Sequence, residues 1–154
     1  MNEGPAGTTG STDDHAFVHS RLIDAPRERV FRAFSDPAHL ARWWGPKGFS
    51  NTFHEFDFRS GGGWRFVMHG PDGKDYKNES VFVEVVAPER IVVEHVLSHH
   101  FLLTITLAAQ GERTLVGWRQ VFDTAAERQR IADIVTEANE QNLDRLAAEV
   151  KNVA

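Results

Sequence analysis

A histidine in an alternating segment is the residue of this sequence best suited to acid–base chemistry. His95 lies in "RIVVEHVL", where it shares a predicted strand face with Ile91, Val93 and Leu97. An imidazole among apolar neighbours can act as a general base near neutral pH. A reaction also needs a nucleophile or groups that stabilise developing charge, and no motif of that kind accompanies His95. The sequence therefore favours a core histidine or a passive pocket lining, and we assign no catalytic residue.

The spacing of the other histidines does not predict a metal site. His15 and His19 share a strand face, but at about 3.3 Å per residue they lie about 13 Å apart, too far for one ion. His99 and His100 point to opposite faces of an extended chain. The chain has no cysteine, which excludes thiolate ligands, disulfides and thiol nucleophiles. We therefore expect no metal and no cofactor.

The glycines at 61–63 do not form a phosphate-binding loop. They precede the extended segment around Trp64 instead of a helix, so no helical N–H groups are available for an anion. A bend or bulge at the start of a strand is the better explanation. Asp57 and Arg59 lie just before the bend, and we expect them to share a strand face. Their predicted role is structural, through pairing with neighbouring side chains.

Two adjacent tryptophans pose the question of an apolar site. Trp43 and Trp44 precede Gly45-Pro46, at the end of a short predicted helix, and the whole chain has only four tryptophans. A tryptophan buries a large ring while its N–H edge can stay near water. Two of them at the mouth of a loop indicate a wall for an apolar molecule.

Length and charge limit the possible functions. The chain has 154 residues, and 17 Lys and Arg against 22 Asp and Glu give a net charge of −5. There is no basic field for a nucleic acid. The longest apolar run, near 101–109, is too short for a bilayer. Residues 1–14 lack signal-peptide features and are expected to be a disordered tail, so we predict a single cytoplasmic domain over residues 15–154.

The pattern predicts a strand, two short helices, six strands and a long helix. Residues 15–23 alternate as a strand, and helices follow near Pro26 and after a cap at Asp36. From Phe49 to Phe122 the period is two, with turns at 61–63, 70–74, 87–90 and 110–113, which predicts an antiparallel meander. The alternation fails between 49 and 58, which indicates a bulge.

The last segment predicts one helix over residues 125–150. Thr124 and Glu127 form a capping box, and neither glycine nor proline follows. An α+β fold results, in which a curved antiparallel sheet of about seven strands is covered by a long C-terminal helix. A straight helix on a curled sheet leaves a gap, filled by large side chains or left as a pocket. This geometry favours a cavity over a solid aromatic core.

One face of the meander is mostly apolar with a few polar groups, as ligand pockets are. The predicted pocket residues are Trp44, Trp64, Phe66, Met68, His95, Leu103, Ile105, Trp118, Gln120, Asn139 and Leu143. The tryptophans, Phe66 and Met68 would form apolar walls. His95, Gln120 and Asn139 would orient polar atoms of a ligand.

Four stretches in order resemble one family: "LIDAPRERVFRAFSDPAHLARWWGP", "EFDFRSGGGWRFVMHGPDGK", "EVVAPERIV" and "NLDRLAAEV". They are similar to the helix-grip (SRPBCC, START-like and pollen-allergen-like) superfamily, and within it to bacterial homologues of the C-terminal domain of the heat-shock protein 90 ATPase activator. The resemblance implies a helix-grip fold with a cavity, and Trp44 at its rim with one edge in water. The family usually has Gly-Trp where this chain has Ala138-Asn139. Without that indole, the floor of the cavity would be roomier and more polar, or Trp118 of the sheet would fill the space instead.

We therefore expect a non-catalytic domain that binds a small hydrophobic or amphipathic molecule. One alternative is a polyketide cyclase- or dehydratase-like enzyme, as in some superfamily members, with His95 as the first candidate for proton transfer. Another is a protein that interacts with a chaperone, as the family's eukaryotic namesake does. No membrane partner is expected. The resemblance to the superfamily, whose members often form dimers, makes a homodimer plausible.

Overall fold

The computed structural model describes residues 15–97 and 99–154. The expected disordered tail, residues 1–14, lies outside the described residues. The strands are β1 (Ala16–Ile23), β2 (Ser50–Phe56), β3 (Gly63–His69), β4 (Asp75–Val86), β5 (Arg90–His95), β6 (Phe101–Gln110) and β7 (Arg113–Phe122). The helices are α1 (Arg27–Ser35), α2 (Pro37–Trp43), α3 (Ala125–Arg130) and α4 (Ala132–Val150). The predicted order of elements is confirmed.

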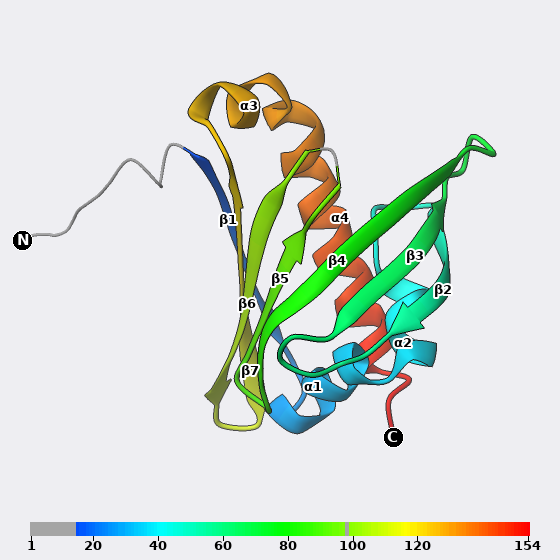
Figure 1. Cartoon of the computed structure of the whole chain (residues 1–154). Coiled ribbons are helices and arrows are strands. Elements are labelled where there is room, and N and C mark those ends of the chain that lie inside the picture. Colours follow the sequence, from blue (N-terminus) through cyan, green and yellow to red (C-terminus); the bar gives the residue numbers. More distant parts are fainter. Residues whose placement is uncertain (1–14, 98) are drawn as a thin grey trace, which may run out of the picture.

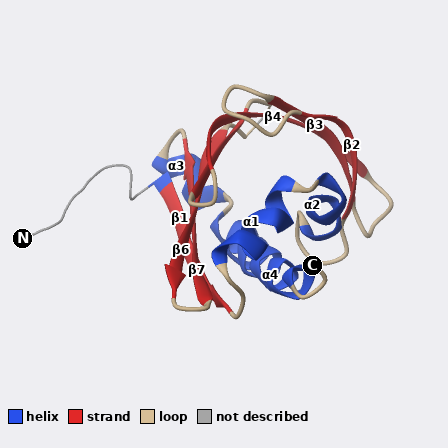
Figure 2. Ribbon diagram, turned by 90° about the horizontal axis from the view of Figure 1, so that it is seen from below, coloured by secondary structure: helices blue, strands red, loops and turns tan. Residues whose placement is uncertain are grey.

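All seven strands form one antiparallel sheet in the order β1-β7-β6-β5-β4-β3-β2. The sheet curls around α1, α2 and α4, which lie inside its curve (Figure 2). Figure 1 shows α4 crossing the sheet diagonally. The helix-grip fold class is therefore confirmed. Among the described residues, no helix has both the length and the apolar content to cross a membrane.

Two irregular strand pairings help to bend the sheet. The register shifts between Phe53 and Glu55 in β2, which confirms the predicted bulge, and again between Phe82 and Glu84 in β4, which was not predicted. A bulge adds one residue to one strand and increases the local bend. The two bulges thus contribute to the curvature that makes room for the helices.

The helix starts follow the predicted caps. The Asp36 carboxylate accepts a hydrogen bond from the Ala38 N–H at 2.9 Å, and Pro37 opens α2. The Thr124 hydroxyl accepts one from the Glu127 N–H at 3.0 Å. These side chains satisfy backbone donors that the first helical turn leaves free.

The prediction of one unbroken helix over 125–150 is wrong. The backbone leaves helical geometry at Ile131 (φ −110°, ψ 9°), which separates α3 from α4. Arg128 holds α3 against the first strand, because its Nε donates to the Ala16 carbonyl at 3.0 Å and its guanidinium lies 4.2 Å from the centre of the Phe17 ring. Since α4 must instead run across the sheet, tertiary contacts override a sequence that favours helix throughout.

Gly61 and Gly62 lie in the turn between β2 and β3 and Gly63 opens β3, which agrees with the predicted bend at the start of a strand. The Asp57 N–H donates to the Gly63 carbonyl at 2.9 Å, and a Cβ at Gly62 would collide with the Asp57 carbonyl oxygen. Asp57 and Arg59 fall in this turn instead of on a strand face, and they pair with each other, with both carboxylate oxygens 2.9 Å from Arg59 Nε. Their role in the structure is thus to shape the turn.

Candidate functional site

The predicted inner face of the sheet is the concave face. Trp64, Phe66, Leu103, Ile105 and Trp118 are buried there in one core with Leu143 of α4, while Met68 and His95 are partly buried. Leu97 is the exception, since β5 ends at His95 and Leu97 beyond it is 39% exposed. Its predicted place on the inner face is therefore wrong, because the alternation stops where the strand does.

Trp44 lies inside the molecule. Its ring centre is 5.5 Å from that of Trp43, 5.0 Å from Trp64 and 5.7 Å from Trp118, and only 9% of the residue is exposed. The expectation of a rim position with one edge in water is not met, because the chain turns the ring toward the sheet after α2 ends.

Aromatic rings fill the space between α2 and the strands β2 to β4. Trp64 stacks on Phe66 at 4.3 Å and on Phe82 at 5.4 Å, and it meets Phe53 edge-on at 5.5 Å. We call this set the aromatic block; its members are Trp43, Trp44, Phe53, Phe56, Phe58, Trp64, Phe66, Phe82 and Trp118. At this end of the molecule, large side chains of the protein itself occupy the concave side of the sheet.

Arg145 of α4 holds the loop that carries Trp44. Its guanidinium donates to the backbone carbonyls of Arg42, Trp44, Gly45, Pro46 and Phe49 at 2.7–3.4 Å. Burial lowers the pKa of Arg145 below its ordinary value. An arginine offers five N–H donors in a fixed fork, which suits a curved run of carbonyls.

Two asparagines add to this attachment. Asn51 Nδ2 donates to the carbonyls of Ala41 (3.0 Å) and Trp44 (2.8 Å), and Asn142 Nδ2 donates to the Trp43 carbonyl at 3.0 Å. The sequence analysis did not identify Asn51 or Arg145, because nothing in the local pattern marks a polar side chain that will bind a distant loop. The loop is therefore fixed through its backbone.

A polar pair lies between β7 and α4. Asn139 Nδ2 donates to Gln120 Oε1 at 3.0 Å, and both residues are buried. The sequence predicted both as polar pocket groups, and the structure brings them into direct contact. Each side-chain amide has two N–H donors and a carbonyl oxygen, so this single hydrogen bond leaves further donors and acceptors that can bind a polar group of a ligand.

Gln120 also lines a pocket at one end of the sheet, which we call the α4 opening. The pocket has a volume of about 270 Å³, and its lining residues are His99, Phe101, Gln120, Phe122, Ile131, Ile134 and Val135. Ile134 is 75% exposed, and on its other side it lines a second hollow of about 400 Å³ with Pro46, Ala138 and Gln141. The first half of α4 thus has an open surface on both flanks, apolar around Ile134 but with Asp133 and Glu137 also lining the second hollow.

His95 is placed as a structural residue. Its Nε2 lies 3.1 Å from Asn78 Oδ1, and its ring stacks on Phe101 at 4.8 Å. Burial lowers the pKa of His95, and a hydrogen bond with the His99 backbone opposes this in part. The ring is therefore neutral at neutral pH, and no hydrogen bond to a carboxylate is found for it among the described residues. This arrangement supports the role of a packed histidine.

Five of the other histidines contact carboxylates: His19, His39, His69, His99 and His100. His100 contacts Asp123 through Nδ1 and Glu94 through Nε2, both at 2.7 Å, and His99 contacts Glu127 at 2.7 Å. Hydrogen bonds to Glu94 and Asp123 raise the pKa of His100. Within residues 15–97 and 99–154, no group of three or more His, Asp or Glu side chains is arranged to hold a metal ion.

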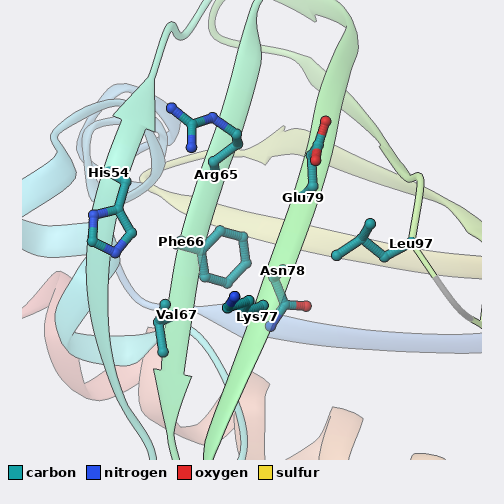
Figure 3. A pocket seen from close by; sticks show the side chains of 8 residues that line it. All are labelled: His54, Arg65, Phe66, Val67, Lys77, Asn78, Glu79 and Leu97. Atoms are coloured by element: carbon teal, nitrogen blue, oxygen red, sulfur yellow. The ribbon is translucent and has the colours of Figure 1, made fainter.

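A third hollow, of about 360 Å³, lies over β2, β3 and β4 (Figure 3). Its lining residues are His54, Arg65, Phe66, Val67, Lys77, Asn78, Glu79 and Leu97. It includes Phe66 alone of the predicted pocket residues, and charged side chains form much of its wall. Its position coincides with the bulge of β2 and with the stretch of β4 that extends past the end of β5.

Comparison with known proteins agrees with this architecture. A sequence model of the Activator of Hsp90 ATPase homolog 1-like protein family matches residues 24–151. The chain belongs to this family. Among curated proteins, none is significantly similar to it.

Solved structures of similar proteins share the whole fold. A protein from Arthrobacter aurescens has 24% identity and a TM-score of 0.84, over 95% of this chain and 91% of that one. A protein from Chromobacterium violaceum has 30% identity and a TM-score of 0.76, over 86% of this chain and 95% of that one. An AHSA1 protein from Silicibacter pomeroyi has 23% identity and a TM-score of 0.70, over 88% of this chain and 97% of that one.

One departure from the expected family pattern can now be located. Where the resemblance predicts Gly-Trp, this member of the family has Ala138-Asn139, and Asn139 binds Gln120 of β7. Trp118, two residues before Gln120 on the same strand face, packs against Trp44. Both groups named in the two expected outcomes, the Asn139 amide and the Trp118 indole, thus lie in this region, and which of them replaces the missing indole stays a prediction.

Proposed function

We propose that this protein binds a small hydrophobic or amphipathic molecule at the α4 opening, without catalysing a reaction. The observation that carries the proposal is the combination of an open apolar mouth with a buried polar pair behind it, Gln120 and Asn139. Ligand sites in proteins are mainly apolar with a few polar groups that fix orientation. The family and fold support a ligand-binding or Hsp90-activator-like role at family level.

The size and position of the opening fit an elongated molecule. About 270 Å³ is slightly below the usual range of ligand-site volumes, about 300–1,000 Å³. The adjoining hollow of about 400 Å³ shares Ile134 and extends the surface along α4 toward Pro46. An apolar body would lie across Ile134, Phe101 and Phe122, and a polar end would reach Gln120. Of the predicted wall residues, those of the aromatic block would form the closed end of the site.

We favour ligand binding over the two alternatives on specific grounds. A proton-transfer enzyme based on His95 lacks support, because Nε2 of the imidazole already contacts Asn78 Oδ1 and no carboxylate contacts the ring among the described residues. A role like that of the Hsp90 ATPase activator rests on the family description alone, whereas the α4 opening is a feature of this chain.

Binding of a fluorescent amphipath, 8-anilinonaphthalene-1-sulfonate, tests the proposal. Ile134→Ser removes the most exposed apolar side chain of the opening and is expected to weaken binding about tenfold, since a buried isoleucine contributes roughly 1.5–3 kcal/mol. Val18→Ser is the matched control, because Val18 is 68% exposed on β1, away from the opening, against 75% for Ile134. Equal affinity of both variants and the parent protein would remove the opening from consideration.

Native mass spectrometry of gently purified protein is a second measurement. A co-purified small molecule that is retained by the Val18→Ser variant and lost by the Ile134→Ser variant would support the site and identify the ligand. Retention by both variants would place any ligand elsewhere.

A further inference from the structure

Two buried donors of the aromatic block make no hydrogen bond to the protein. The indole N–H groups of Trp64 and Trp118 are both buried, with 1% and 3% of the residues exposed, and neither has an acceptor among the described residues. Trp43 differs, since its N–H donates to the Ala33 carbonyl at 2.8 Å. Buried polar groups normally find a partner, so two such donors in one cluster require an explanation.

The ring of Trp44 contacts both of these indoles. Its centre lies 5.0 Å from that of Trp64 and 5.7 Å from that of Trp118, although β3 and β7 are far apart in the sheet. An indole has one N–H donor and no acceptor. Trp44 can therefore offer these two donors no conventional hydrogen bond, and at most a weak contact with the face of its ring.

The Trp44 side chain can leave this position without freeing its loop. The hydrogen bonds that hold residues 42–49 to Arg145 and Asn51 all go to backbone carbonyls. Rotation of the side chain breaks none of these bonds. Pro46, two residues further along the same loop, lines the open hollow beside α4.

We propose that Trp44 is a displaceable occupant of a ligand site, and that the group which replaces it is a flat aromatic ring with a hydrogen-bond acceptor. The acceptor receives the N–H of Trp64 or of Trp118 if it is a ring nitrogen, which has one lone pair, and can receive both if it is a carbonyl oxygen, which has two. This inference rests on the proposed ligand-binding function and specifies the chemistry of the molecule at the closed end of the site.

Three probes of similar size separate the acceptor from ring shape: quinoline has an acceptor, naphthalene has no polar group, and indole has only a donor. Trp44→Ala opens a ring-sized space beside the unpartnered donors. This variant is expected to bind quinoline at least tenfold more tightly than naphthalene or indole, as measured by titration. The parent protein is expected to show the same order of preference with weaker affinity, because Trp44 must first move.

Trp43→Ala is the matched control, because it opens a neighbouring space whose free polar group is the Ala33 carbonyl, an acceptor. Its expected preference is reversed, with indole bound more tightly than quinoline. Equal affinities of quinoline and naphthalene for Trp44→Ala would overturn the proposal.

Indole N–H resonances in proton–nitrogen NMR spectra give a second measurement, on the parent protein. Before ligand is added, the Trp64 and Trp118 signals are expected upfield of the Trp43 signal, which reports a bonded N–H. Quinoline, with one acceptor lone pair, is expected to move one of the two downfield and to leave the Trp43 signal in place. Unmoved signals, or cross-relaxation of both N–H groups with bound water in the free protein, would overturn the proposal even if Trp44→Ala fails to fold.

The two proposals can fail separately. If quinoline shows no preferential binding but 8-anilinonaphthalene-1-sulfonate still binds at Ile134, the α4 opening remains the proposed site and displacement of Trp44 is rejected. Quinoline binding with no effect of Ile134→Ser would reject the opening instead.

Discussion

The two ends of the concave face differ in how they are filled. The aromatic block is a continuous set of ring contacts, and Trp64 alone meets five other rings. The α4 opening, between the ends of β6 and β7 and the start of α4, is also apolar, but Ile134 there is mostly exposed. The same curvature thus yields a solid core where rings are supplied from both sides, and an accessible surface where α3 and α4 only partly cover the sheet.

The largest expected effect of a single substitution is in the aromatic block. Trp64→Ala is expected to lower the free energy of unfolding by about 3–5 kcal/mol, because the surrounding rings collapse only in part. Phe101→Ala at the α4 opening should cost about 1–2 kcal/mol, since Phe101 is only partly buried. Urea denaturation measures both. Equal losses would mean that the two ends are packed alike.

Arg145→Met tests the attachment of the loop. Loss of the guanidinium leaves several part-buried carbonyls without a donor, and we expect about 1.5–3 kcal/mol of destabilisation. Tryptophan emission should shift to longer wavelength as Trp44 gains access to water. Arg145→Lys keeps the charge but has fewer donors, so its free energy of unfolding should lie between those of the parent protein and Arg145→Met. An unchanged emission spectrum in Arg145→Met would show that Trp44 is held by its ring contacts alone.

Asn139→Trp examines whether Trp118 occupies the place of the expected family indole. A tryptophan at 139 would crowd the space near Gln120 and Trp118, with an expected cost of about 1–3 kcal/mol. In the double variant with Trp118→Ala the two changes should compensate, with a coupling of about 0.5–3 kcal/mol in a thermodynamic cycle. Strict additivity would show that the two positions do not share space.

The smallest expected effect concerns pH. Hydrogen bonds to Glu94 and Asp123 raise the pKa of His100 in the folded state. The stabilisation is therefore complete below the unfolded pKa of about 6.5 and is lost as pH rises through the folded value. His100→Gln should lower stability by under about 1 kcal/mol at acidic pH, since the pair is partly exposed, and by nothing at alkaline pH. Denaturation at a series of pH values gives the comparison, and a constant difference at all pH values would contradict it.

Local patterns predicted what depends on local geometry. The period of two gave the six strands from β2 to β7 and their inner face, and the caps at Asp36 and Thr124 marked two helix starts. The break at Ile131 was missed because it follows from the contact of Arg128 with β1. The inward turn of Trp44 and the role of Arg145 were missed for the same reason, since the first depends on contact with Trp118 and the second on contact with Gly45, each far away in the sequence. The roles of the predicted pocket residues stay a prediction.

The sheet order also bears on how the chain is made. β1 pairs only with β7, so residues 16–23 find their partners at 114–121, nearly at the other end of the chain. On a ribosome, this first strand leaves the exit tunnel long before its neighbour is synthesised. Its backbone and apolar side chains stay exposed until the hairpins of the meander have formed. During that time the strand can contact other nascent chains.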